Sequence, residues 1–341
     1  MKFALELSDE FGPSGQEERV AALIKKELSG ASLSFVSDPL GSLIAEKIGR
    51  SKGPGIILSA HMDEVGFMIS HIHEDGTLSF RIIGGIDKRV LPGKTVVIGD
   101  GRVKGVIMVP PVHLSKGDDP YEAEDLRMFI GAGCLEEASE RVGVGDCAVF
   151  ATKACRTGER LMGKAWDDRI GCFVLTEILK KNWDINITGI FTVQEEVGLR
   201  GIQTALHHVK GEFGFAVEGT TSYEIPAEPE VSPSTWLSKG PAITAMDRAS
   251  IGSPSLKKLL EEVAKKGNIP FQYKKTATGG TETKFLQQNR TGMQAICLSV
   301  PVRYIHSPAG ICSEDDVKNT VLLLEKTMRL LEAKLKKVYG G

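Results

Sequence analysis

The sequence lacks any apolar run long enough to cross a membrane, which would need about 18 residues with few charges. Its N-terminal stretch, MKFALELSDEFGPSGQEERV, reaches acidic residues before an apolar segment of signal-peptide length. Neither a membrane span nor a cleaved leader is therefore expected. We expect a cytoplasmic protein.

An excess of positive charge is lacking too. The 42 Lys and Arg residues nearly balance the 44 Asp and Glu residues, and no basic block interleaved with aromatics occurs. Because a phosphate backbone is bound through clustered positive charge, nucleic acid is not an expected partner. The six cysteines form no C-x-x-C pair, and none stands beside a histidine at zinc-finger spacing. We therefore expect free, mostly buried thiols rather than three disulfides.

The sequence does have enough apolar residues for a sizeable core. Its 341 residues, 41% of them hydrophobic, suffice for one large domain and a smaller one. The expected strands are SLIAEKI (42–48), GIILSA (55–60), ITGIFTV (187–193), GFAV (214–217) and QAICLSV (294–300). The expected helices cover residues 168–181, 254–267 and 313–337. This alternation predicts an α/β fold, specifically a three-layer α/β/α sandwich around a mostly parallel sheet.

Two helix starts are predicted from capping patterns. Ser14 and Glu17 fit a capping box ahead of apolar residues at helical spacing, namely Val20, Leu23, Ile24 and Leu28. Ser313 and Asp316 fit the start of the last helix. We expect the apolar stripe of that helix, which begins at Val317, to pack on the sheet.

Residues 66–153 have a different texture. Short β-like runs such as TLSFRIIGG and VGVGDCAVF are separated by glycine, and no Pro- or Ser-rich linker flanks the segment. The pattern predicts a small β barrel or sandwich inserted into a discontinuous main domain, which residues 1–65 and 154–341 would form.

Titratable side chains follow four of the predicted strands. These are His61 after GIILSA, Glu195 and Glu196 after ITGIFTV, Glu218 after GFAV, and His306 just beyond CLSVPVRYI. Asp167 stands in KAWDDRIG, ahead of a predicted helix. Because the carboxyl ends of parallel strands lie on one edge of a sheet, we expect these side chains to meet there.

Imidazole and carboxylate groups without thiolate suit two divalent cations, with zinc or cobalt preferred and manganese allowed. Close cations share a ligand, and a carboxylate is the side chain able to bridge them; we assign this role to Asp167. The adjacent Glu195 and Glu196 need an irregular backbone, because neighbours on a strand point to opposite faces. One would then bind metal while the other faces the attacking water. Asp63, two residues after His61, is placed to accept the second imidazole N–H.

Several motifs extend over the whole chain. They are FGPSGQEERV, HMDEVGFMI, PPVHL, KAWDDRIG, TVQEEVGLRG, SKGPAI, GGTET and VPVRYIHSP. On these motifs the chain resembles the glutamyl and deblocking aminopeptidases, also called tetrahedral aminopeptidases, of the zinc exopeptidase clan. The resemblance implies a metallo-aminopeptidase, a hydrolase that removes N-terminal residues from peptides. It also implies a dodecamer built from dimers, in which the inserted β domain makes contacts between subunits and controls access to the site.

The resemblance also implies a role for each candidate residue. Two overlapping sets would hold the cations, one of His61, Asp167 and Glu218 and the other of Asp167, Glu196 and His306. Glu195 would be the general base, and Asp63 would orient His61. Glu218 and Glu282 stand where the family commonly has aspartate. We expect the first to alter metal affinity and the second to reshape the substrate pocket.

The remaining polar residues have simpler explanations. We expect structural or solvent-exposed places for Asp168, His71, His73, His113, His207 and His208. Arg303 fits either a contact with substrate or an ion pair beside the ligands.

Two other classes of function stay open. One is an amidase, deacylase or carboxypeptidase of the same clan acting on N-acyl substrates. The other is a noncatalytic metal-binding assembly protein, against which the presence of Glu195 counts. A glycosidase is not expected, because no pair of carboxylates is left without a metal to bind.

Overall fold

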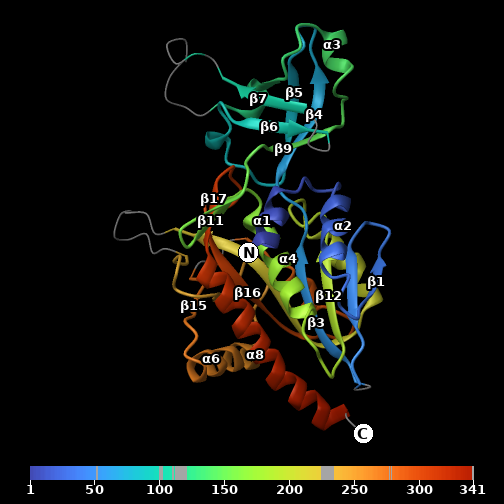
Figure 1. The fold of residues 1–341 in the computed structure, drawn as a ribbon, viewed down its shortest axis with the longest axis vertical. Coiled ribbons are helices and arrows are strands. Elements are labelled where there is room, and N and C mark those ends of the chain that lie inside the picture. Colours follow the sequence, from blue (N-terminus) through green and yellow to red (C-terminus); the bar gives the residue numbers. More distant parts are fainter. Residues whose placement is uncertain are drawn as a thin grey trace.

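The structure of the chain is a computed structural model. It describes residues 1–50, 53–99, 103–109, 111, 121–223, 234–275, 277 and 279–339. His113 lies outside these residues. A large sheet flanked by helices forms one end of the molecule, and a small barrel forms the other (Figure 1).

Among the residues that the structure describes, the large sheet has 11 strands. Nine follow one another across it in the order β1 (Ser34–Ser37), β2 (Leu43–Lys47), β12 (Ile187–Thr192), β3 (Gly55–His61), β13 (Gly211–Ser222), β16 (Gln294–Arg303), β17 (Gly310–Ser313), β11 (Arg160–Gly163) and β10 (Cys155–Thr157). Beside β16 lie β14 (Ala242–Thr244) and β15 (Gln272–Tyr273). All five strands expected from the sequence are present.

The sheet is mixed, which corrects the prediction of a mostly parallel sheet. Its centre, β12, β3, β13 and β16, is a continuous run of parallel strands, and β14 and β15 beside it form a further parallel pair. The outer pairs β1–β2, β2–β12, β16–β17, β17–β11 and β10–β11 are antiparallel. The connections β1–β2 and β10–β11 are too short for a crossover, so they can only return the chain antiparallel. The α/β class holds, with parallel pairing where long connections permit it.

Helices pack against both faces of this sheet. Alternate residues of β3 show the two faces, because Ile56 and Leu58 belong to one apolar cluster and Ile57 to another. The first cluster includes apolar residues of α1 (Lys2–Asp9), α2 (Glu18–Glu27), α4 (Trp166–Leu179), α6 (Pro254–Lys266) and α8 (Glu314–Tyr339). The second includes residues of α5 (Arg200–Ala205), η4 (Leu206–His208) and α7 (Thr283–Gln287). As expected, the stripe of α8 is buried at Val317, Leu324, Met328, Leu331 and Leu335.

The two predicted capping patterns serve other purposes. The Ser14 hydroxyl donates to Oδ2 of Asp63 at 2.6 Å, and no side chain caps α2. The oxygens of Asp316 accept the backbone N–H groups of Ser238 and Gly240 at 2.6 and 2.7 Å. The capping prediction for α2 is therefore wrong, because Ser14 bonds a partner distant in sequence. The last helix does begin directly after Ser313, as predicted, although the Asp316 side chain binds a distant segment.

The barrel closes from six strands. They are β4 (Gly66–Ile72), β5 (Leu78–Ile83), β8 (Arg127–Phe129), β7 (Val103–Met108), β6 (Thr95–Ile98) and β9 (Cys147–Phe150). Short helices η1 (Lys88–Val90), η3 (Ala123–Asp125) and α3 (Leu135–Ser139) lie between them in sequence. Phe67 packs edge-on against Phe80 and Phe150 in a core separate from that of the sheet. The barrel begins directly after β3, so it stands at the carboxyl edge of the parallel strands (Figure 1).

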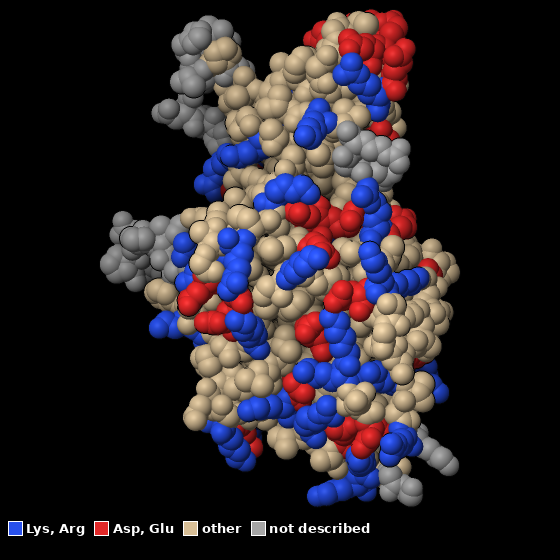
Figure 2. Space-filling view, in the orientation of Figure 1, with Lys and Arg blue, Asp and Glu red and all other residues tan. Residues whose placement is uncertain are grey.

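The surface and the cysteines agree with the composition. On the face drawn in Figure 2, basic and acidic side chains are interspersed, and acidic ones gather at the tip of the barrel near α3. All six cysteines are free, four of them buried and two, Cys134 and Cys155, exposed. Within the described part of the chain, no helix combines the length and the apolar character needed to span a membrane.

Candidate active site

The carboxyl edge of the parallel strands gathers the predicted residues. His61 ends β3, and in the sheet register it lies opposite Thr192, which ends β12 just before Glu195. Glu218 lies within β13 rather than after it, because this strand continues to Ser222. His306 follows the end of β16. Segments far apart in sequence thus converge on one edge.

Asp167 lies between the two histidines. Its Oδ1 is 3.2 Å from Nε2 of His61, and its Oδ2 is 3.2 Å from Nε2 of His306. Although Asp167 falls in the first turn of α4, its φ and ψ of −88° and 107° are not helical. This departure from the helix turns the side chain toward the strand ends, so one carboxylate faces both imidazoles.

The three glutamates surround this centre. Nε2 of His61 lies 3.7 Å from Oε2 of Glu218 and 3.8 Å from Oε2 of Glu195. Nε2 of His306 lies 3.0 Å from Oε1 of Glu196. Ligand atoms of Asp167, Glu196 and His306 come within 4.8 Å of one another, which is compatible with a shared metal ion.

Asp168 also lies close to His61 and Glu218, yet its oxygens already have partners. Oδ1 accepts the N–H groups of Gly171 and Gly219 at 3.0 and 2.9 Å, and Oδ2 accepts the His61 N–H at 3.1 Å. These three backbone bonds tie α4 to β3 and β13. The role of Asp168 is therefore structural: it holds together the elements around the site.

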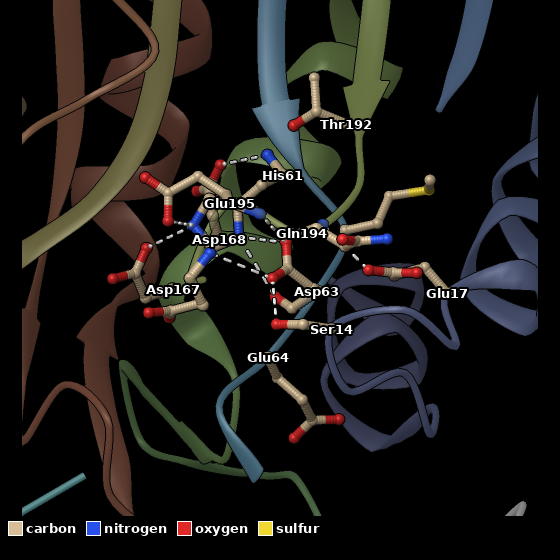
Figure 3. A network of polar contacts seen from close by, with 12 residues as sticks. Ser14, Glu17, His61, Asp63, Glu64, Asp167, Asp168, Thr192, Gln194 and Glu195 are labelled. Carbon is tan, nitrogen blue, oxygen red and sulfur yellow. Dashed lines mark hydrogen bonds and ion pairs between the residues drawn. The ribbon is translucent and has the colours of Figure 1, made fainter. Parts of the chain in front are cut away.

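Asp63 joins the histidine to the glutamate pair. Its Oδ1 lies 3.4 Å from Nδ1 of His61, on the side of the ring away from Asp167. The same carboxylate accepts the backbone N–H of Glu195 at 3.0 Å through Oδ1 and that of Glu196 at 3.1 Å through Oδ2 (Figure 3). Although burial opposes its charge, hydrogen bonding to His61 keeps the pKa of Asp63 below its ordinary value.

The acidic side chains of the site are strongly perturbed. Burial raises the pKa of Glu195 well above its ordinary value; the charge of His61 opposes the shift, while Glu196 and Asp167 add to it. Burial likewise raises the pKa of Glu218. Burial opposes the charge on His306, but hydrogen bonds from its ring to Asp167 and Glu196 outweigh it and raise the pKa to about 11. Such a cluster is stabilised by added positive charge, whether protons or cations.

The donor set fits divalent metal ions. Oε1 of Glu218 is buried and makes no hydrogen bond to any described residue. Buried polar atoms nearly always have a partner, and a cation would supply one here. The candidate clusters in the described residues contain imidazole and carboxylate but no cysteine, which suits zinc, cobalt or manganese.

A cavity of about 370 Å³ opens over the cluster. Besides the site residues it is lined by Thr220, Thr221, Lys274, Thr281 and Ile305. None of these five was a candidate from the sequence. Thr281 and Ile305 lie in two of the quoted motifs, GGTET and VPVRYIHSP. Thr220 and Thr221 closely follow Glu218, whereas Lys274 carries no sequence signal that separates it from other lysines.

Glu282 does not line this cavity. It is fully buried, and its Oε1 accepts the Thr192 hydroxyl at 2.5 Å. Burial raises its pKa to about 7, against the hydrogen bonds from Thr192 and Ser59. The adjacent Thr281 lines the cavity, and the expectation that Glu282 reshapes the substrate pocket stays a prediction.

The other histidines lie outside the cluster. The rings of His71 and His73 pack edge-on at 4.6 Å between centroids, and Nε2 of His73 bonds the Ser79 hydroxyl. Among the described residues neither belongs to a group that could hold a metal ion. His207 and His208 lie in η4 on the far face of the sheet. The Arg303 guanidinium lies 6.0 Å from the centroid of the Tyr304 ring.

A histidine–carboxylate cluster at the carboxyl edge of an α/β sheet is typical of metal-dependent hydrolases. The chain belongs to the family of M42 glutamyl aminopeptidases, which it matches over residues 41–323. The predicted family and the predicted class, a hydrolase of peptide bonds, are thereby confirmed.

Individual relatives agree with this assignment. The chain is 32% identical over 333 residues to a lysyl aminopeptidase of Pyrococcus furiosus, covering 94% of each chain. It superimposes with a TM-score of 0.93 on a TET aminopeptidase from a marine sediment archaeon, Thaumarchaeota archaeon SCGC AB-539-E09, at 34% identity over 99% of this chain and 98% of that one. It is also similar to the TET1 peptidase of Pyrococcus horikoshii, described as assembling into a tetrahedron or a large octahedral shell. There the TM-score is 0.85 and the identity 33%, over 95% of this chain and 98% of that one.

Proposed function

We propose that this chain is an aminopeptidase that releases N-terminal residues from peptides at a site for two divalent cations. The observation that carries the proposal is the position of Asp167, whose two oxygens each face a different histidine at 3.2 Å. A carboxylate so placed is suited to bridging two ions.

The ligands divide into two halves around that bridge. His61 and Glu218 would complete one half with Asp167, and Glu196 and His306 the other. Zinc or cobalt fits this donor set best, and manganese is compatible with it. When bound, the cations would polarise the scissile carbonyl and lower the pKa of the attacking water.

Glu195 is the proposed general base. Glu195 lies in the cluster but belongs to neither of the two proposed ligand sets. Burial raises the pKa of its carboxylate, which suits a group that takes up a proton. It would accept the proton of the attacking water and deliver it to the leaving amine. Asp63 would hold the His61 ring and the backbone of Glu195 in place.

We propose that identical chains form dimers and that these dimers assemble into a dodecamer. The similarity to a TET1 peptidase that assembles into a shell supports this. In such an assembly the barrel, within the predicted inserted domain 66–153, would make contacts between subunits and limit access to the site. The main domain would comprise residues 1–65 and 154–341. The cytoplasmic location and the absence of nucleic-acid partners remain predictions from the sequence.

One experiment tests cofactor, substrate and base together. The purified protein is analysed for metal, stripped with a chelator, reloaded with single metals, and assayed on aminoacyl anilides and N-acetyl amino acids. We expect two cations per subunit and cleavage confined to substrates with a free amine. Turnover of N-acetyl amino acids alone would favour an amidase or deacylase, and two bound metals without any turnover would favour a noncatalytic assembly protein.

Glu195→Gln sharpens this experiment. The variant should bind two cations and lose about 100- to 10,000-fold in kcat, because general acid–base catalysis typically contributes that much. Near-normal turnover with both metals bound would contradict the proposed role of Glu195.

A further inference from the structure

Three consecutive backbone N–H groups donate to carboxylates. The Gln194 N–H donates to Oε1 of Glu17 at 3.0 Å. The next two, those of Glu195 and Glu196, donate to the two oxygens of Asp63. Figure 3 shows Glu17 approaching Gln194 from the side of the N-terminal helices, opposite Asp167. Two acids from separate segments therefore hold one three-residue stretch of backbone.

This stretch is where the chain departs from strand geometry. Gln194 has a φ of 54°, in the left-handed region that non-glycine residues seldom adopt, at a cost of about 1–3 kcal/mol. The turn closes when the carbonyl of Glu195 accepts the N–H groups of Gly198 and Leu199 at 2.9 and 2.8 Å. It is this conformation that lets Glu195 and Glu196 face the same cluster although they are neighbours in sequence.

Glu17 is itself firmly held. Its side chain is buried, and its Oε1 also accepts the Gly15 N–H at 2.7 Å. The loop before it is tied to the site as well, because Ser14 donates to Asp63 and the Glu64 N–H donates to the carbonyl of Gly12 at 3.0 Å. The segment between α1 and α2 is therefore part of the support beneath the site.

We infer that Glu17 is a positioning residue, which holds Gln194 in the left-handed conformation and thereby places Glu195 in the site. The inference rests on the proposed function, because it concerns the geometry of the proposed base. Glu17 acts as an acceptor rather than as a charge, since its Oε1 accepts the backbone N–H groups of both Gly15 and Gln194. Burial, helped by the charge of Asp63, raises the pKa of Glu17 to about 7.

This distinction yields a test with two near-isosteric variants. Glu17→Gln keeps an oxygen at the same distance from the Gln194 N–H and removes the charge. Glu17→Asp keeps the charge and withdraws the oxygens by one methylene. We expect Glu17→Asp and Glu17→Ala to lower kcat about 10- to 100-fold, since small misplacements of a reacting group cost that much. KM should change little, and the loaded proteins should keep two cations per subunit. Glu17→Gln should restore kcat to within about threefold of wild type.

A matched control comes from the other end of the molecule. Glu332 is also buried, and its Oε1 accepts a backbone N–H, that of Asp184, at 2.6 Å. Glu332→Ala should lower the unfolding temperature and leave kcat unchanged. Because the readouts are kcat, KM, metal content and unfolding temperature together, a loss of folding is separated from a loss of placement.

Several outcomes would overturn the inference. They are a wild-type kcat in Glu17→Asp and Glu17→Ala, an equal kcat loss in Glu332→Ala, or a Glu17→Gln variant as impaired as Glu17→Asp. Glu195→Gln, assayed beside them, keeps the two proposals apart. If that variant retains turnover, the proposed function fails at its base; if it is inactive while Glu17→Asp is normal, only the inference about Glu17 fails.

Discussion

The two histidines of the site sit in contrasting surroundings. The His61 side chain is 1% exposed and ends a strand paired on both sides, whereas that of His306 is 30% exposed and lies in a loop at a φ of 56°. Nδ1 of His61 faces Asp63 within the core, while Nδ1 of His306 bonds the carbonyl of Gly85, beyond β5 of the barrel, at 2.8 Å. One half of the site is thus built by the sheet, and the other by loops that meet the barrel. Substitutions in the sheet half should therefore lower the stability of the protein more than substitutions in the loop half.

The largest effects should come from removing each histidine. His61→Ala and His306→Ala should each lose one of two cations and at least about 100-fold in activity, because a metal ligand matters at least as much as the group that orients it. In metal-free protein both variants should lower the free energy of unfolding, since each leaves carboxylates without a partner. The loss should be larger for His61→Ala, about 1–3 kcal/mol, because the His61 side chain is 1% exposed and that of His306 is 30% exposed. Metal analysis and denaturant unfolding measure both. Equal stability losses in the two variants would contradict the contrast between the halves.

A smaller effect is expected from Asp63→Asn. The variant keeps the shape but loses an acceptor shared by His61 and the glutamate backbone, so metal affinity should fall about 10- to 100-fold. Titration calorimetry on stripped protein measures this. Asp38→Asn is the matched control, because Asp38 is also buried and accepts the N–H groups of Leu40, Gly41 and Ser42. That control should lose stability and keep its metal affinity. An unchanged affinity in Asp63→Asn would show that Asp63 does not support metal binding.

The smallest effect on activity is expected from Glu17→Gln, where the change to measure is in stability and its pH dependence. Its folded-state pKa of about 7 lies above the ordinary value of 4.5, because burial disfavours the charged form. Its protonated form is favoured by folding, so the stability it contributes is complete below about pH 4.5 and is lost as the pH rises through 7. Glutamine does not titrate. Between pH 5 and 8 the Glu17→Gln variant should therefore gain up to about 3 kcal/mol in unfolding free energy relative to wild type. Parallel pH profiles for the two proteins would show that Glu17 ionises normally.

The same contrast explains what could be predicted from the sequence. Residues in the sheet half follow from apolar runs, because a run such as GIILSA fixes a central strand and parallel pairing fixes where His61 lies. The motif pattern also led to His306, although its loop backbone has no periodicity. What failed were features decided by distant partners. Ser14 satisfied a local capping pattern but bonds Asp63, and Asp316 accepts backbone N–H groups of a segment 76 to 78 residues earlier in the chain.

Glu17 illustrates the limit most clearly. Its spacing from Ser14 is that of a capping box, and nothing local distinguishes an acid that would cap a helix from one that accepts the N–H of a residue 177 positions away. The outer strands of the sheet pose a similar problem. Runs as short as Arg160–Gly163 carry little apolar signal, so the antiparallel flanks were not foreseen.

The central claim is that Asp167 is shared by two cations. Asp167→Asn, purified, stripped and reloaded with zinc or cobalt, should be analysed for metal content per subunit beside wild type. If the two halves depend on one bridge, wild type should hold two cations and the variant should lose affinity for both. A variant that loses one cation and binds the other with wild-type affinity would show that Asp167 serves a single ion, and would contradict the bridged site.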